Sequence, residues 1–362
     1  MYASRLAVAL RERTGAQFFG MGGPRMREAG VEILADYHEV AVVGIAEVLH
    51  KIPSVVRVQN LLAREAARRK AALAILVDSP GTHLGVARRL KNLGIPVGYF
   101  IGPQIWAWRP GRVRIVRRRV KRMVVIFPFE EKIYRHAGVP VDFVGHPLVD
   151  TVKPAMSRDE FIGRYNLDPS RPIVALLPGS RSSEVGRNFP AILEACALLA
   201  KQMPPQSAPQ FVHAAAPGIG SSAAANVDVT RVEGATYDAL AAADCAIVAS
   251  GTATVEAALL GAPMVVVYRV APLTAAILRH MVRTDLFAMV NLIAGRRIVT
   301  ELMQDDFTPA AVAAEVRRLL ENPAARQEMK AALAEVRASL GGGGAIERAA
   351  GVFAAMLPSS ES

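Results

Sequence analysis

Short, continuous apolar runs alternate with helical patterns along almost the whole chain, and this rhythm limits the fold more than any other feature. The runs 71–77 (AALAILV), 95–101 (IPVGYFI) and 122–129 (RMVVIFPF) show no alternation of apolar and polar side chains. Uninterrupted apolar strands are typical of parallel sheets that are covered by helices on both faces. The pattern therefore predicts a doubly wound α/β structure.

The same rhythm occurs twice, on either side of a stretch at 151–172 that is rich in proline, serine and charge. The 362 residues are enough for two domains of about 150 residues each. We expect two Rossmann-like domains, 1–165 and 166–340, that face each other across a cleft. A last helix at 345–358 follows a run of glycines and can cross back to the first domain.

The beginning of the chain departs from this rhythm. Doubly wound domains usually begin with a strand whose glycine-rich turn leads into the first helix, whereas residues 1–15 already read as an amphipathic helix. Either the fold is unusual, or this reading frame lacks the first strand and its loop. The same residues lack the three regions of a signal peptide.

Composition excludes several classes of protein. A hydrophobic fraction of 52% and a charged fraction of 21% argue against a disordered chain and a charged coiled coil. The two cysteines, Cys196 and Cys245, exclude a disulfide scaffold and indicate a reducing compartment. No apolar run approaches the about 18–20 residues of a membrane span, so we expect a cytoplasmic protein. The net charge of +11 favours an acidic partner, which is nucleic acid, an anionic membrane or a phosphorylated substrate.

The first candidate site is the turn in LLPGSRSSEV (176–185), where a buried strand ends in Gly179, Ser180 and Arg181 before a helix. Backbone amides at such a helix N-terminus suit phosphate oxygens, and Arg181 adds a two-pronged donor for a diphosphate. The alternative is an ordinary strand–helix turn with an exposed arginine.

The second candidate site is the turn in VASGTATVEAALLGAP (248–263), where another strand ends in Ser250, Gly251 and Thr252. The small residues let a ligand approach the backbone, and Glu256 in the next helix can hold ribose hydroxyls. Such turns often serve only to begin a helix. Two of them at strand ends in one domain favour a nucleotide diphosphate.

The third candidate is Asp78, which directly follows the apolar run 71–77. A carboxylate at a strand end lies at the mouth of a cleft, where partial burial can raise its pKa toward the range of a general base. The alternative is a cap for the helix that begins near His83. No cluster of histidines and carboxylates has metal-ligand spacing, so we expect no metal and no cofactor.

Two basic segments complete the pattern. Residues 102–122 carry both tryptophans, Trp106 and Trp108, among arginines that could hold nucleic acid or form a solvated helix face. Residues 42–70 read either as a surface that dips into an anionic bilayer or as a core helix. The candidate membrane contacts in the second segment are apolar: Ile45, Val48, Leu49, Ile52 and Val55.

Taken in this order, the motifs resemble the lipid-A-disaccharide synthases, a family of inverting glycosyltransferases with two Rossmann-like domains of the GT-B type. The stretches that carry the resemblance are FFGMGGPRMREAGVE (18–32), EVAVVGIAEVL (39–49), DSP (78–80), GPQIWAWRPGRV (102–113), IFPFE (126–130), FVGHPLVD (143–150), LLPGSR (176–181), ASGTATVEAAL (249–259), VVVYRV (265–270) and NLIAGRRIVTELMQ (291–304). The WAWR and LLPGSR stretches together are specific, whereas the rhythm alone is not.

The resemblance implies transfer of 2,3-diacylglucosamine from its UDP donor to the 6-hydroxyl of 2,3-diacylglucosamine 1-phosphate (lipid X). By that analogy Asp78 is the essential carboxylate, and Arg181 neutralises the diphosphate as UDP leaves. The turns described above and Asn291 would line the UDP pocket. The partners would be the two lipid substrates and the anionic inner face of the cytoplasmic membrane, with no nucleic acid. Family members often form dimers through their C-terminal regions, which leaves a homodimer open.

The chain departs from the family pattern in two places. The family opens with a strand and a glycine-rich loop beside the active site, and this chain begins just after the point where that loop would end. Gly81 and Thr82 stand where the family usually has a second aspartate and an aromatic residue. Both departures concern the acceptor side more than the UDP side.

Three alternatives remain at this level. The first is another UDP-sugar enzyme of the same fold, such as a different lipid-acceptor transferase or a UDP-N-acetylglucosamine 2-epimerase. The second is a basic protein that binds nucleic acid through 102–122, with steep salt dependence and no affinity for UDP. The third is a truncated, inactive paralogue that still binds UDP.

Overall fold

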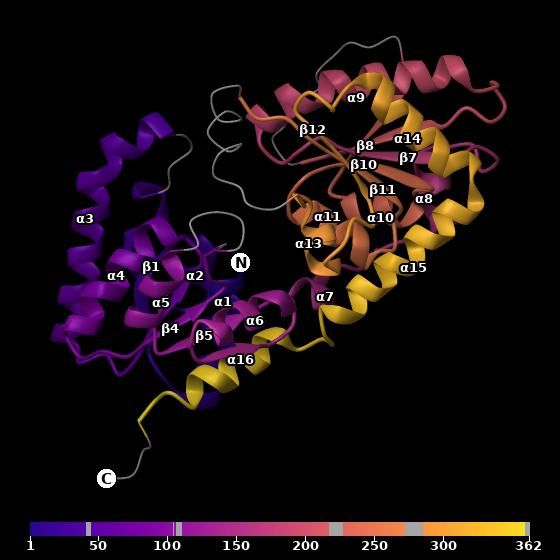
Figure 1. Ribbon diagram of the computed structural model, residues 1–362. Helices are drawn as coiled ribbons and strands as arrows, with labels where there is room; N and C mark the ends of the chain where they lie inside the picture. The colour runs from indigo at the N-terminus through magenta and orange to yellow at the C-terminus, as the bar shows by residue number, and fades with distance from the viewer. Residues whose placement is uncertain (41–44, 104, 106–110, 217–226, 272–284, 359–362) are drawn as a thin grey trace. The chain divides into compact units, whose positions relative to one another are not determined.

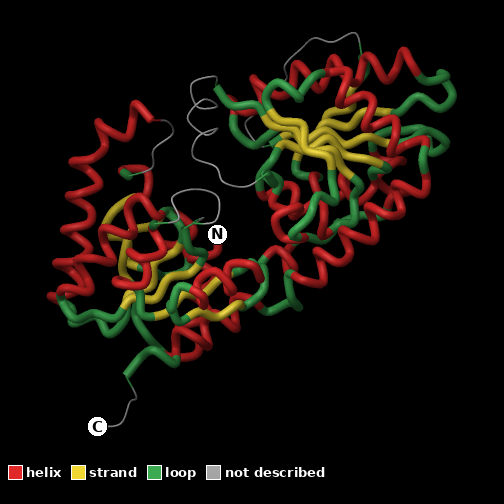
Figure 2. Tube along the Cα trace, in the orientation of Figure 1, coloured by secondary structure: helices red, strands yellow, loops and turns green. Residues whose placement is uncertain are grey.

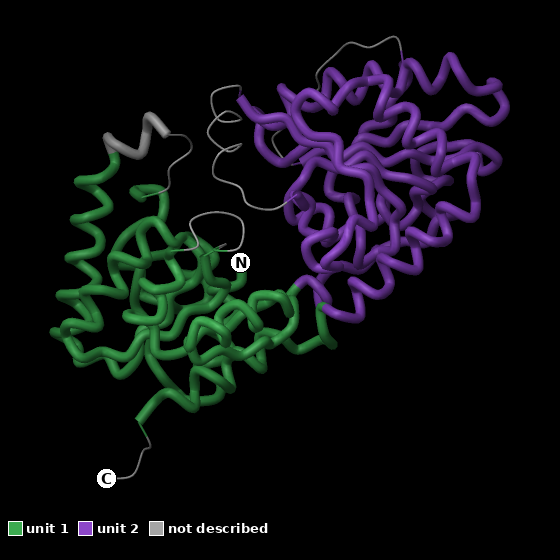
Figure 3. Tube along the Cα trace, in the orientation of Figure 1, with its two compact units in different colours: residues 1–147, 340–362 green, residues 148–339 purple. Residues whose placement is uncertain are grey.

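The computed structural model describes the chain except residues 41–44, 104, 106–110, 217–226, 272–284 and 359–362 and the side chains of 45–50 (Figure 1). The described chain divides into two compact units (Figure 3). Unit 1 contains residues 1–147 and 340–362, and unit 2 contains residues 148–339.

Unit 2 is built on one six-stranded parallel sheet, drawn in yellow in Figure 2. Its strands are β7 (Ile173–Leu177), β8 (Gln210–Ala215), β9 (Val229–Glu233), β10 (Cys245–Ala249), β11 (Met264–Tyr268) and β12 (Thr300–Met303). The spatial order is β12-β11-β10-β7-β8-β9, which is the Rossmann order 3-2-1-4-5-6 read from the opposite edge. The chain therefore reverses direction across the sheet between β7 and β10.

Helices enclose this sheet and explain why its strands are apolar throughout. All five residues of β7 and of β10 are buried. The helices of unit 2 are α7 (Leu148–Thr151), α8 (Arg158–Arg164), α9 (Ser182–Gln202), α10 (Thr236–Ala242), α11 (Thr252–Leu259), α13 (Met289–Ala294), α14 (Pro309–Glu321) and α15 (Pro323–Ser339). Continuous apolar runs thus mark strands that have no solvent-facing side.

Unit 1 differs from the single doubly wound sheet that we expected. Its strands are β1 (Phe19–Gly22), β2 (Glu32–Asp36), β3 (Ala74–Val77), β4 (Val97–Phe100), β5 (Arg122–Val125) and β6 (Val141–Phe143). They form a two-stranded sheet, β1-β2, and a four-stranded sheet, β3-β4-β5-β6, both parallel. No described strand pairs with both β1 and β3, and such a strand would be needed to join the two sheets.

Helices from both ends of the chain meet in unit 1. They are α1 (Tyr2–Thr14), α2 (Pro24–Glu28), the 3-10 helix η1 (Tyr37–Glu39), α3 (Ile45–Arg68), α4 (Pro80–Asn92), α5 (Arg112–Arg119), α6 (Pro128–His136) and α16 (Ala345–Ala354). Helix α16 packs against α1, and Arg13 pairs with Glu347 at 3.2 Å. A Cβ on Gly98 would lie 2.5 Å from the buried Phe353 ring, so only glycine lets α16 approach β4 this closely.

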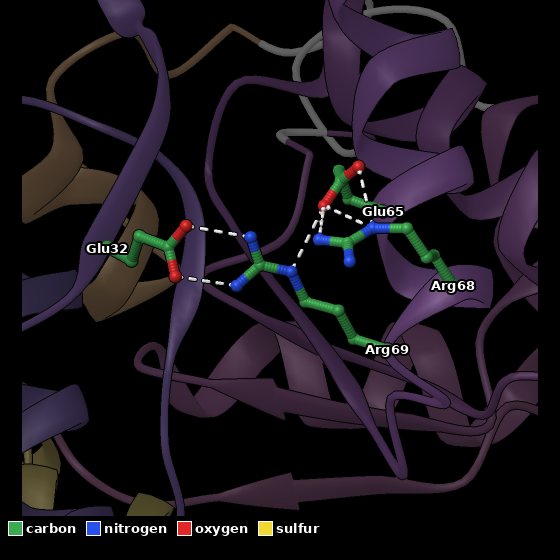
Figure 4. Close-up of polar contacts among 4 residues, drawn as sticks. All are labelled: Glu32, Glu65, Arg68 and Arg69. Atoms are coloured by element: carbon green, nitrogen blue, oxygen red, sulfur yellow. Dashed lines mark hydrogen bonds and ion pairs between the residues drawn. The ribbon is translucent and has the colours of Figure 1, made fainter.

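The long helix α3 is tied to β2 by an ion-pair network (Figure 4). Arg69 bonds both carboxylate oxygens of Glu32, at 2.5 and 2.7 Å, and also Glu65 at 3.0 Å. Arg68 shares Glu65 at 2.6 Å. The hydrogen bonds from Arg68 and Arg69 lower the pKa of Glu65 to about 2. The C-terminal end of α3 is therefore held against the sheet.

The units divide between residues 147 and 148, earlier in the chain than the expected boundary at 165. Helix α8 packs against α10, and Arg158 pairs with Asp244 at 2.9 Å. The backbone N–H of Met156 donates to Asp238 at 2.9 Å. These contacts join residues more than eighty positions apart, so a local change in composition cannot reveal them.

Candidate nucleotide site and catalytic carboxylate

The two phosphate-type turns of unit 2 follow neighbouring strands. Gly179 and Ser180 come after β7, and Ser250 and Gly251 come after β10. Strands β7 and β10 pair directly, at the point where the order of the sheet reverses. Open α/β sheets bind ligands at the carboxyl ends of strands beside such a reversal. The sheet therefore brings the two predicted turns to one edge.

The turn after β7 is shaped by a glycine in a conformation that other residues rarely adopt. Gly179 has a φ of +137°, and a Cβ added there would lie 2.6 Å from the Cβ of Glu184. The Ser180 and Arg181 side chains are exposed. Helix α9 begins directly after Arg181, so the positive end of its dipole points at the turn. The turn has the geometry and polarity of an anion-binding site.

The carboxylate of Glu184 lies in this turn. Its Oε2 accepts from the backbone N–H of Ser180 at 3.1 Å and of Arg181 at 3.4 Å, and its Oε1 accepts from Nη1 of Arg181 at 2.6 Å. Two amides and a guanidinium thus converge on one negatively charged group. The same three donors suit a phosphate oxygen.

The turn after β10 is arranged in a similar way. Gly251 has a φ of +150° and precedes α11, which begins at Thr252. The Ser250 hydroxyl donates to the carbonyl of Phe287 at 3.4 Å. Glu256 lies one turn into the helix and accepts from the Tyr237 hydroxyl at 3.1 Å. Burial raises the pKa of Glu256, and the bond from Tyr237 opposes this shift.

Asn291, which was expected to line the UDP pocket, is engaged within its own segment. Its side chain is fully buried, with Nδ2 donating to the Val299 carbonyl at 2.9 Å and to Glu301 at 2.7 Å. Its Oδ1 accepts from the backbone of Ile298 and Val299, at 2.8 and 3.0 Å. An asparagine can make these four bonds and no more. Asn291 therefore holds its own segment and has no polar atom left for a ligand.

Asp78 lies in unit 1, after β3, and its side chain is exposed. The Asp78 carboxylate therefore lacks the partial burial that was expected from its place at a strand end. The helix-cap alternative is also wrong, because α4 begins at Pro80 and its N-cap residue is Ser79, which makes no side-chain cap bond. The backbone of Asp78 is in the left-handed region, with a φ of +52°.

The predicted membrane surface of α3 lies partly within the described residues. Ile52 is 48% exposed and Val56, one turn later, is 40% exposed. Val55, also predicted as a membrane contact, is partly buried and packs against the cluster of Ala35, Val40 and Val58. The side chains of Ile45, Val48 and Leu49 lie outside the described residues, as do Trp106 and Trp108.

Comparison with known proteins identifies the family. Residues 1–351 match the protein family described as lipid-A-disaccharide synthetase. The lipid-A-disaccharide synthase of Geobacter sulfurreducens is 44% identical over 361 residues, which cover 98% of this chain and 93% of that protein. The synthase of Myxococcus xanthus is 44% identical and covers 99% and 94%. This chain belongs to the lipid-A-disaccharide synthase family.

Solved structures share the fold of this lipid-A-disaccharide synthase family member at low identity. The calicheamicin glycosyltransferase CalG4 has a TM-score of 0.59 at 17% identity, covering 100% of this chain and 96% of that chain. MurG of Acinetobacter baumannii has a TM-score of 0.57 at 14% identity, covering 97% and 95%. The predicted fold class, that of the GT-B glycosyltransferases, is confirmed.

Several residues of this synthase family member were not anticipated from its sequence. Glu184 and Tyr237 contact predicted site residues, and Asn188 is a buried tether that donates to Pro178 at 2.9 Å and accepts from Arg269 at 3.1 Å. A carboxylate three residues after an arginine in the first turn of a helix was the one available signal. Among the described residues, no group of histidine, cysteine and carboxylate side chains could hold a metal ion.

Proposed function

We propose that this chain is a lipid-A-disaccharide synthase that transfers 2,3-diacylglucosamine from its UDP donor to the 6-hydroxyl of lipid X. The products are the β-1,6-linked lipid A disaccharide 1-phosphate and UDP. The observation that carries the proposal is the family match over residues 1–351, together with 44% identity to the Geobacter sulfurreducens enzyme across nearly the full length of both proteins.

Unit 2 is the proposed donor-binding unit. The diphosphate of UDP binds the backbone amides of the turn at Gly179 and Ser180, with Arg181 as the charged partner. The amides at a helix N-terminus and a planar guanidinium are both suited to this charge. Arg181 stabilises the leaving group most strongly in the transition state, because negative charge builds up on UDP as the bond to the sugar breaks.

The turn after β10 is the proposed nucleoside side of the same site. Ser250, Gly251 and Thr252 approach the ligand through small side chains and hydroxyls, and Glu256 accepts hydrogen bonds from the ribose hydroxyls. Asn291 contributes indirectly. It bonds Glu301, and Glu301 accepts from the backbone N–H of Phe287 at 3.1 Å, beside the Ser250 hydroxyl.

Asp78 of unit 1 is the proposed general base. It takes the proton from the 6-hydroxyl of lipid X as that oxygen forms a bond to the anomeric carbon of the donor sugar. The bond between the anomeric carbon and the phosphate oxygen breaks, and its electron pair leaves with UDP. A positioned base of this kind contributes about 10²–10⁴-fold to the rate.

The proposed site of action is the inner face of the cytoplasmic membrane, where the enzyme binds peripherally. No described helix has both the length and the apolar character to cross a membrane. Residues 79–129 carry eleven lysines and arginines and no carboxylate, so this segment accounts for the whole net charge of +11. Helices α4 and α5 of that segment pack together, and their charge favours an anionic lipid surface. The exposed Ile52 and Val56 would enter the membrane interface.

The formation of a homodimer stays a prediction.

The test is UDP release from UDP-2,3-diacylglucosamine, with and without lipid X, in detergent micelles. We expect release that depends on lipid X. UDP binding without release would support the truncated-paralogue alternative, and the absence of both would contradict the proposal. Steep salt-dependent binding to any polyanion without UDP affinity would favour the nucleic-acid alternative.

Two variants test the roles of individual residues. Asp78→Asn keeps the size of the side chain, and we expect turnover to fall about 10²–10⁴-fold while UDP affinity is retained. Arg181→Ala should weaken UDP binding about tenfold or more, because it removes a charge-assisted hydrogen bond. Arg317→Ala, an exposed arginine of the same unit, is the control and should leave both quantities unchanged.

A further inference from the structure

Backbone strain is concentrated where β3 and β4 end. Asp78, Ser79 and Ile101 have φ values of +52°, +48° and +57°. Residues other than glycine rarely adopt such values, and for a β-branched residue such as isoleucine they are a genuine outlier. Strained backbone persists only when the surrounding structure holds it in place. The contacts that hold Asp78 are therefore informative.

The backbone N–H and the carbonyl oxygen of Asp78 both make two contacts within hydrogen-bonding distance. Its N–H donates to the carbonyls of Phe100 and Ile101, at 3.1 and 3.2 Å. Its carbonyl oxygen accepts from the Tyr99 hydroxyl at 2.7 Å and lies 2.7 Å from Nδ1 of His83. The first pair of bonds comes from the neighbouring strand, and the second pair comes from two side chains.

Both side chains are fixed as donors. A carbonyl oxygen can only accept, so Nδ1 of His83 carries the hydrogen. Tyr99 is fully buried in the core of unit 1, and burial raises its pKa, so the hydroxyl keeps its proton. The His83 and Tyr99 rings meet edge to face, with centroids 6.3 Å apart. The two donors therefore support each other as well as the carbonyl.

The Asp78 carboxylate itself makes no hydrogen bond to any described side chain and is exposed. The region of space that the carboxylate can reach is consequently set by the backbone, through the direction of the Cα–Cβ bond, and not by contacts of its own. Any change that lets Asp78 relax to a negative φ would redirect the carboxylate, since the Cβ moves with the backbone. Control of this dihedral is therefore control of the direction of the Cα–Cβ bond that carries the carboxylate.

We infer that His83 and Tyr99 are positioning residues that hold the Asp78 backbone in its left-handed conformation and so aim the carboxylate at the acceptor hydroxyl. This inference rests on the proposed function for the identity of the reaction. It assigns to His83 a role that depends on Nδ1 alone.

The first test is the kinetics of Tyr99→Phe, His83→Leu and the double variant in the lipid X-dependent assay. Each single change should lower kcat about tenfold and the double change about 100-fold, because small displacements of a reacting group have effects of that size. KM for the UDP donor and UDP affinity should stay unchanged, since unit 2 is untouched.

Two control variants separate positioning from packing. Tyr134→Phe also removes a buried tyrosine hydroxyl from the same core, where it donates to Pro103 at 3.3 Å, and should keep wild-type kcat. His83→Asn places an amide donor near the position of Nδ1 and should restore most of the activity lost in His83→Leu. Equal losses in His83→Asn and His83→Leu, or an unchanged kcat in Tyr99→Phe and His83→Leu, would overturn the inference.

A crystal structure of the double variant gives a readout that does not need turnover. We expect Asp78 to leave the left-handed region. A φ that stays near +52° would show that the two side chains do not hold it. If the wild type releases no UDP, the proposed function fails, whereas this structural result still decides whether His83 and Tyr99 fix the backbone.

Discussion

The Glu184 carboxylate lies in the turn after β7 that is proposed to hold the diphosphate of UDP, so a diphosphate bound there would displace it. Its bonds to Ser180, Arg181 and the Arg181 guanidinium use the donors that UDP is proposed to need. A resident carboxylate satisfies these donors in the absence of nucleotide. It also opposes the ligand with a charge of the same sign.

Glu184→Gln should therefore bind UDP more tightly, by about tenfold, because a charged competitor for the same donors is removed. Isothermal titration with UDP measures the effect. Glu194→Gln is the matched control, since Glu194 is exposed on the same helix and removes the same charge about 15 Å further along. Weaker binding by Glu184→Gln would mean that Glu184 orients Arg181 and does not compete with the ligand.

His213 gives unit 2 a defined response to acid. It is 4% exposed on β8 with its ring 4.3 Å from that of Phe189, and burial followed by the nearby Arg231 lowers its pKa to about 4. The unfolded chain binds this proton near pH 6.5, so the folded state loses stability as the pH falls from about 6.5 to about 4.

Between pH 7 and pH 4.5, we expect His213→Phe to remove about 2.5 kcal/mol of that loss, since one pKa unit corresponds to about 1.4 kcal/mol. Urea unfolding at pH 7 and pH 4.5 measures the difference. Burial also lowers the pKa of His146 in unit 1 to about 4, so this second histidine adds to the pH dependence of the wild type. An identical pH dependence in the variant and the wild type would contradict the assignment.

Among the elements, α3 combines an anchored end with an exposed apolar face. The Arg69 network fixes its C-terminal end to β2 (Figure 4), and Ile52 and Val56 lie exposed nearer its beginning. An anchored helix can present apolar side chains to a bilayer without losing its own packing. The exposed pair is therefore the part of the proposed membrane surface that can be tested directly.

Ile52→Asp should weaken binding to phosphatidylglycerol–phosphatidylethanolamine vesicles about tenfold, because it removes buried apolar area and adds a charge that the lipid repels. Vesicle sedimentation measures the partition. Ala67→Asp adds the same charge to an exposed position of α3, about 22 Å away, and should have little effect. Equal losses in both variants would place the contact elsewhere.

Sequence patterns located elements better than they located side chains. The apolar runs of β7 and β10 and the turns that follow them were predictable. A parallel strand that is buried on both faces is a continuous apolar run, which can be recognised without knowing the strand that pairs with it. Asn291 was predicted as a ligand contact, but its four bonds depend on Glu301 and on how a distant segment packs. Val55 was assigned to the outer face, although the phase of α3 turns it inward.

For the molecule as a whole, the chain passes between the units twice, at 147–148 and at 339–340. The first crossing lies before the predicted boundary at 165, since residues 148–165 contact distant parts of unit 2, as α8 does with α10 and Arg158 with Asp244. Each unit is built on its own sheets, so each can be perturbed separately.

Phe353→Ala should destabilise unit 1 by about 3–5 kcal/mol, because it removes a fully buried ring from the contact with Gly98. Calorimetry should show that one transition moves to lower temperature while the other stays in place. UDP should raise the transition temperature of unit 2 and leave that of unit 1 unchanged, since a ligand stabilises the unit to which it binds. If both transitions moved together, the units would unfold as one.

The partnership of α1 with α16 has a consequence for synthesis on the ribosome. Helix α1 packs against α16, and every residue of unit 2 lies between these two helices in the chain, so all of unit 2 is made before α16 appears. Domains generally fold as units while the chain grows. Unit 2 can therefore reach its native state while unit 1 still exposes the face of α1 that α16 will cover.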